Sequence, residues 1–158
     1  MDDTTREDEQ QLQALQEQFL AALEYNRRGD ADSAVKLLEG VLRGEPRLAE
    51  PRLELGRIRL EMGHLEEAEH QTREALVVFL AGGQWVDDIS EEQMLSVAHG
   101  QLAEVLRRRA DCDEVLFGDP GVFKGLVAEY KQHFDEAARL DPDNAHAGYF
   151  AFQMEGEE

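Results

Sequence analysis

Five histidines and one cysteine are the side chains of this sequence best suited to hold a metal ion or attack a substrate. No two histidines have the His-x3-His or His-Glu-x-x-His spacing that would place both imidazoles on one helix face. Cys112 lacks a second cysteine with which to complete a zinc site. We therefore expect no catalytic centre, no metal and no cofactor, so the chain should not be an enzyme. The histidines are His64, His70, His99, His133 and His146.

Two further segments are candidate sites for phosphate or for an acidic partner. Residues 118–121 (GDPG) lack the lysine and serine of a phosphate-binding loop, and their composition predicts a turn. Residues 107–109 are three consecutive arginines in an otherwise acidic chain. Basic side chains are favourable at the C-terminal end of a helix, and they could equally contact an acidic partner, so both interpretations stay open.

The charge of the chain excludes several kinds of partner. Its 158 residues include 35 acidic and 16 basic side chains, a formal net charge of −19. Nucleic acids and anionic membranes attract basic surfaces, so we expect neither as a partner. The charge suits either solubility or attraction to a basic protein. With one cysteine, no apolar leader and no apolar run of about 20 residues, we expect a cytoplasmic location.

One pattern occurs twice within residues 15–80, at an interval of 34 residues. Gly29 and Gly63 are separated by this interval, and so are Ala34 and Ala68. Apolar residues recur at helical spacing on both sides of each glycine, so each copy predicts a helix, a turn and a second helix. Because the apolar stripe of each helix is narrow, the copies must stack on one another to be stable.

This pattern resembles the tetratricopeptide repeat, which has a period of 34 residues. In that family a small residue in the first helix lets the second helix approach closely, and Ala22 and Gly56 occupy this position here. Pro46 ends the first copy as the family's proline does, whereas the second copy runs into glycines at residues 82–83. The resemblance implies an all-α fold, a short right-handed superhelix of about seven helices.

The third copy is predicted to be interrupted. The first copy spans 24 positions from Ala22 to Pro46, and the third spans 39 from Ala103 to Pro142, an excess of about 15. We expect a single helical domain over residues 10–154. Its expected parts are an acidic flexible N-terminus at 1–9, repeats at about 15–48, 49–82 and 90–144, an insertion at 110–121, a capping helix at 145–154 and an acidic tail at 155–158.

The resemblance also implies a binding surface, the concave face lined by the first helix of each repeat. Family members that hold the C-terminal carboxylate of a chaperone use lysine and asparagine where this chain has Phe19 and Leu23, which argues against such a clamp. A groove with apolar anchors and a polar rim suits a peptide or a helix. The predicted concave residues are Phe19, Leu23, Asn26, Leu53, Arg57, Leu60, Val97, Gln101, Glu104 and Arg108.

We therefore expect a protein–protein interaction module, an adaptor or assembly chaperone that holds a peptide or helix of another protein in its concave groove. The alternative is an architectural subunit whose groove and insertion mediate self-association as a homodimer. The two hypotheses differ in what covers the apolar residues of the groove, a foreign protein or a second copy of this chain.

Overall fold

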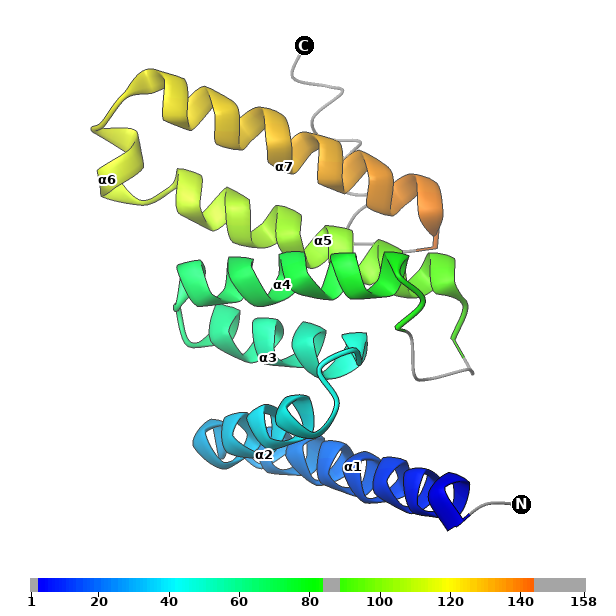
Figure 1. Cartoon of the computed structure of the whole chain (residues 1–158). Helices are drawn as coiled ribbons and strands as arrows, with labels where there is room; N and C mark the ends of the chain where they lie inside the picture. Colours follow the sequence, from blue (N-terminus) through cyan, green and yellow to red (C-terminus); the bar gives the residue numbers. More distant parts are fainter. Residues whose placement is uncertain (1–2, 84–88, 144–158) are drawn as a thin grey trace.

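The computed structural model describes residues 3–83 and 89–143, with side chains from residue 5 onward. Figure 1 shows the helices stacked in layers, from α1 and α2 at one end to α5 and α7 at the other. The all-α prediction is confirmed. Within these ranges the chain forms no strand and seven helices: α1 Asp3–Arg27, α2 Ala31–Gly44, α3 Ala49–Glu61, α4 Leu65–Leu80, α5 Glu91–Ala110, α6 Asp113–Leu116 and α7 Pro120–Leu140.

Glycine makes the two sharp turns that the repeat pattern predicts. Gly29 follows α1 with a φ of +89°, and Gly63 follows α3 with a φ of +81°. Side chains with a Cβ rarely adopt this backbone conformation. After the first turn, the Asp30 carboxylate accepts a hydrogen bond from the Ser33 amide at 3.1 Å and so caps the start of α2. Each second helix can therefore fold back along the first.

A small residue on α3 allows three helices to cross closely. A Cβ added at Gly56 would lie 2.7 Å from Thr72 Oγ1 on α4 and 2.9 Å from Gln101 Nε2 on α5. Gln101 Nε2 donates a hydrogen bond to Thr72 Oγ1 at 2.8 Å, and the Thr72 hydroxyl donates to the Ala68 carbonyl at 2.7 Å. The polar atoms at this crossing are therefore paired in the space that a larger residue would take.

The hydrophobic core extends to both sides of this crossing. A larger cluster joins α3, α4, α5 and α7 and includes Phe79 and Leu102. A smaller cluster joins α1, α2 and α3 and includes Ala22, Leu38 and Ile58. Each helix pair thus buries its apolar side chains against the next pair, which is how repeats stabilise one another. Among the described residues, no helix is both long enough and apolar enough to span a bilayer.

The extra residues of the third repeat are distributed over helices as well as a connection. Helices α5 and α7 have 20 and 21 residues, whereas α2 has 14. The expected insertion at 110–121 is divided, because Ala110 ends α5, α6 forms in the middle and Pro120 begins α7. The Asp119 carboxylate accepts a hydrogen bond from the Gly121 amide at 2.9 Å. Residues 118–121, expected as a turn, therefore lead into a helix, since proline is tolerated in a first helical turn.

The structure also differs from the prediction at the N-terminus. Helix α1 begins at Asp3, so residues 3–9 are helical where we expected a flexible segment. Acidic side chains favour this outcome because the N-terminal end of a helix carries a partial positive charge. The predicted capping helix at 145–154 and the tail at 155–158 lie outside the described residues.

The crossing at α3 predicts opposite effects for two glycine-to-alanine substitutions. Gly56→Ala should lower the free energy of unfolding by about 1–3 kcal/mol, since the new methyl group overpacks Thr72 and Gln101. Gly125→Ala in α7 is the matched control, because an added Cβ there meets no atom within 4 Å. It should raise stability by up to about 1 kcal/mol through helix propensity. Urea unfolding of both variants checks this, and equal effects would contradict the close crossing.

Candidate interaction surfaces

The predicted concave residues lie on α1, α3 and α5, the first helices of the three pairs. We call the surface formed by these residues the inner face. Side chains of α5 bind the backbone of α3: Gln101 Nε2 donates to the Leu53 carbonyl oxygen at 3.0 Å, and Arg108 Nη1 donates to the Leu60 carbonyl oxygen at 3.4 Å. The structure therefore brings the predicted residues of α3 and α5 side by side.

Two predicted anchors of the inner face are part of the core. Leu53 and Leu60 are each only 7% exposed. Leu53 packs in the cluster that contains Phe79, and Leu60 packs in a cluster with Val105 of α5. Because the neighbouring helices cover both leucines, the expectation that they offer a partner an apolar surface does not hold.

The inner face is apolar along α1. Phe19 and Leu23 are half-buried, and next to them Leu12 and Leu20 are 42% and 55% exposed. Leu12 also borders an apolar cleft of about 520 Å³ that includes Val78 near the end of α4. The apolar residues along α1 thus form a stripe that is wider than the part packed against α2 and α3.

The inner face becomes charged on α3, where its charges are paired within the helix. Arg57 forms ion pairs with Glu54 and Glu61, one turn away on either side. Asn26 on α1 is half-buried. Val97 on α5 is 47% exposed and adds an apolar side chain beyond this charged strip. The inner face therefore has an apolar side on α1 and a mixed side on α5.

The arginines at 107–109 occupy the last turn of α5, one of the two roles the sequence left open. Arg107 and Arg108 both form ion pairs with Glu104, and Arg109 forms one with Glu69 of α4. Burial raises the pKa of the Glu104 carboxyl, but hydrogen bonds from the two arginines outweigh burial and hold that pKa below its ordinary value. This basic cluster is therefore largely neutralised within the chain.

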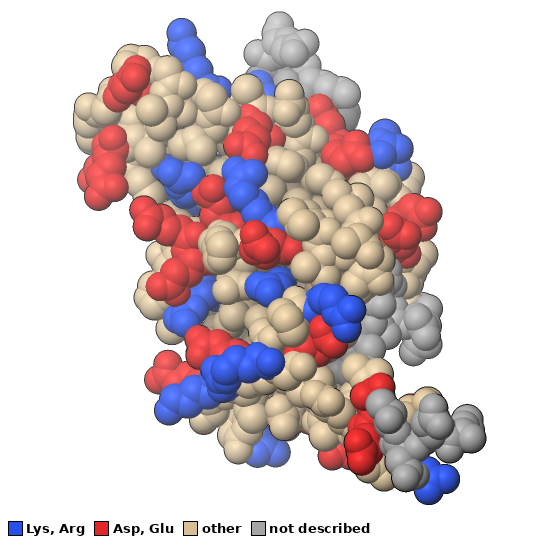
Figure 2. Space-filling view, in the orientation of Figure 1, with Lys and Arg blue, Asp and Glu red and all other residues tan. Residues whose placement is uncertain are grey.

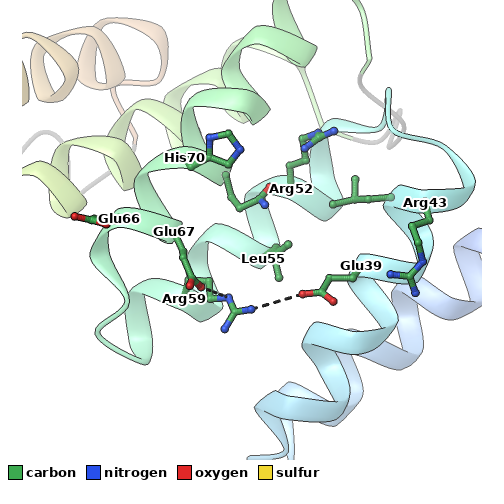
Figure 3. A pocket seen from close by; sticks show the side chains of 10 residues that line it. Glu39, Arg43, Arg52, Leu55, Arg59, Glu66, Glu67 and His70 are labelled. Carbon is green, nitrogen blue, oxygen red and sulfur yellow. Dashed lines mark ion pairs between the residues drawn. The ribbon is translucent and has the colours of Figure 1, made fainter.

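A separate cleft of about 640 Å³ opens between α2 and α4, over α3. We call it the outer cleft (Figure 3). Arg59 lies between its walls, with Nη2 3.6 Å from Glu39 Oε1 on α2 and Nε 3.0 Å from Glu67 Oε2 on α4. Other residues that line the cleft are Leu42, Arg43, Arg52, Leu55, Glu66, His70 and Gln71.

The next outer groove, between α4 and α7 over α5, is filled by polar contacts. His99 Nδ1 lies 2.9 Å from His133 Nδ1, and the two rings stack with centroids 5.1 Å apart. His133 Nε2 lies 3.3 Å from Glu129 Oε2, which also pairs with Arg73 Nη2 at 2.8 Å. Figure 2 shows acidic and basic side chains interleaved over the face of the molecule in view. Ion pairs of this kind tie α4 to α7.

Sequence reasoning missed the contact between His99 and His133. The two residues stand on different helices of the third pair, so no spacing on a single helix connects them. Only the register of α5 against α7 brings their rings together. The structure also contains no group of three or more His, Cys, Asp or Glu side chains able to hold a metal ion within the described ranges.

The stacked pairs of antiparallel helices define the class of the protein, an α-solenoid. Residues 26–76 match the family model for the tetratricopeptide repeat. Two similar solved structures cover nearly the whole chain at low identity. The first TPR of Spaghetti (RPAP3) bound to the HSP90 peptide SRMEEVD has a TM-score of 0.66 at 11% identity, over 92% of this chain and 93% of that chain.

The second similar structure is the N-terminal domain of stress-induced protein-1 (STI-1) from C. elegans. It has a TM-score of 0.65 at 9% identity, over 88% of this chain and 93% of that chain. Residues 26–76 thus match the tetratricopeptide repeat that the repeat pattern predicts, and both similar structures share the fold of the chain. No curated protein matches the sequence significantly.

The histidine contact predicts a loss of stability in mild acid. Burial lowers the pKa of His99, and the nearby His133 and Arg139 lower it further, against a smaller opposing effect of Glu136. The His99 imidazole therefore binds a proton more tightly in the unfolded chain than in the folded chain. The free energy of unfolding should decrease as the pH falls below about 6.5, by at most about 1.4 kcal/mol per pH unit for this one proton.

Urea unfolding between pH 7 and pH 5 measures this dependence. His99→Gln should flatten it, whereas His70→Gln, which changes an exposed histidine, should leave it unchanged. The low pKa values of Glu129 and Glu136 act in a separate window, below about pH 4.5, where protonating these carboxylates costs stability. If the free energy of unfolding of His99→Gln decreased between pH 7 and pH 5 as steeply as that of the wild type, the contact of His99 with His133 would not control this pH dependence.

Proposed function

We propose that the chain is a non-enzymatic protein-interaction module, an adaptor or assembly chaperone that holds a peptide or helix of another protein on its inner face. The observation that carries this proposal is the apolar stripe of α1, where Leu12 and Leu20 are largely exposed beside Phe19 and Leu23. Contiguous exposed apolar residues on a soluble protein are costly unless another surface covers them. A partner segment that lies along α1 would supply this cover.

The remaining inner-face residues would orient such a segment. Arg57 on α3 and Arg108 on α5 lie beyond the apolar stripe, and Val97 offers a second apolar contact at the far side. Since the helices are already packed, binding would order few groups of the module itself and lose little conformational entropy. We infer a partner with an apolar face and polar groups along one edge, as an amphipathic helix has.

A carboxylate clamp is not part of this proposal. The similar RPAP3 domain binds an HSP90 peptide, and family members that clamp a chaperone's terminal carboxylate use lysine and asparagine at the positions of Phe19 and Leu23. Neither phenylalanine nor leucine can donate a hydrogen bond to a carboxylate. We therefore propose apolar recognition at these positions, with a protein as the partner class.

A second candidate function, self-association, is favoured by the tip formed by α6 and the start of α7. Phe117 is 86% exposed, and Leu116, Val122 and Phe123 are between 37% and 49% exposed. Two such tips, or a tip and an inner face, could pack together in a homodimer. Light scattering at micromolar concentration distinguishes this from the first candidate, because a monomer whose mass is unchanged by Phe117→Glu would contradict self-association.

Partner capture from cells of the native host tests the proposed function. Val97→Glu places a charge on the inner face without disturbing the core, because Val97 is 47% exposed, and should reduce capture of the bound protein at least about tenfold. Leu80→Glu on α4 is the matched control, since Leu80 is 73% exposed and belongs neither to the inner face nor to the residues that line the apolar cleft beside Leu12. Equal capture by the two variants would contradict binding at the inner face.

A further inference from the structure

The outer cleft has the features of a second binding site. We propose that it binds a peptide segment in which an acidic residue adjoins an apolar residue. The carboxylate would lie on Arg43 and Arg52, and the apolar side chain would pack against the half-buried Leu42. This proposal goes beyond the function proposed for the inner face and does not rest on it.

The outer cleft is on a different side of α3 from the inner face. Arg52, Leu55 and Arg59 recur at intervals of three and four residues, so they share one side of the helix. Arg57, which belongs to the inner face, is two residues from both Leu55 and Arg59 and points elsewhere. A ligand in the outer cleft would therefore leave the inner face open.

Two arginines, Arg43 and Arg52, line one end of the cleft. Within the described ranges neither Arg43 nor Arg52 forms an ion pair, although most arginines of this acidic chain do. The Arg52 guanidinium contacts only a neutral acceptor there, the Pro46 carbonyl oxygen, at 3.2 Å and 3.4 Å. Arg43 is exposed. The planar fork of a guanidinium matches the two oxygens of a carboxylate.

The opposite end of the cleft is acidic, so a bound segment would have a preferred direction. Glu66 and Glu67 lie in the first turn of α4, away from Arg43 and Arg52, as Figure 3 shows. Between the two ends, Leu55 lies at the centre of the view. A segment with its acidic residue toward Arg43 would meet attraction at that end and repulsion at the other.

One orphaned polar atom also lines the cleft. Gln71 Oε1 is buried and has no hydrogen-bond partner among the described residues. Buried acceptors are nearly always satisfied in folded proteins. A rotation of the Gln71 side chain into the cleft would bring this oxygen within reach of a backbone N–H of a bound peptide, a donor that sulfate lacks.

Size and screening are both compatible with a short peptide. A volume of about 640 Å³ falls within the range of about 300–1,000 Å³ that is usual for ligand sites.

The net charge of −19 repels an acidic ligand at long range. At physiological salt this repulsion is screened beyond about 8 Å, so the local charges of the cleft dominate binding.

Fluorescence anisotropy with a labelled hexapeptide that carries one glutamate beside one leucine, with glycine and serine at the other positions, tests the proposal on the full chain. The probe should bind saturably with a Kd below about 1 mM at physiological salt. The same peptide with glutamine in place of glutamate should bind at least about tenfold more weakly, because it lacks the charge-assisted hydrogen bonds. Absence of saturable binding to the wild-type chain would overturn the proposal.

Two double variants locate the site. Arg43→Glu with Arg52→Glu should weaken probe binding at least about tenfold. Arg27→Glu with Arg28→Glu makes the same change in net charge at exposed residues that pair with Glu24, and should have a much smaller effect. Circular dichroism confirms that both variants fold. Equal weakening in the two variants would mean that overall charge governs binding, and would overturn the assignment to the outer cleft.

Discussion

The close crossing of α3, α4 and α5 at Gly56 is the constraint on which the rest of the structure depends. The crossing distance decides whether the second and third pairs can share a core, and a single Cβ at Gly56 would meet Thr72 and Gln101 below ordinary contact distance. The amide of Gln101 binds both Thr72 and the Leu53 carbonyl, so it fixes the register of α5 on α3. That register in turn positions Val97 and Arg108 on the inner face.

The two outer grooves show how the same architecture can give different surfaces. Between α4 and α7, direct ion pairing of Arg73 with Glu129 and the contact of His99 with His133 join the walls. Between α2 and α4, the walls are joined through Arg59, with one contact as long as 3.6 Å. The longer helices of the third pair provide more positions for such contacts. The outer cleft, between α2 and α4, is consequently the groove that stays open to a ligand.

The fold was largely predictable from the sequence because its determinants are local. Glycines with positive φ at 29 and 63, and small residues at 22 and 56, can be identified from residue type and spacing alone. The candidate surface was less predictable. Burial of Leu53 and Leu60 depends on how α5 lies against α3, which no pattern within α3 reveals. The apolar stripe on α1 could be predicted, since its residues follow helical spacing.

Hydrogen exchange of the chain bound to a captured partner is the most direct test of the proposal that the inner face is the binding surface. We expect slower exchange in backbone amides of α1 around Phe19 and of α5 around Val97 when the partner is bound. Protection confined to α6 and the start of α7, with no change in α1 or α5, would contradict it.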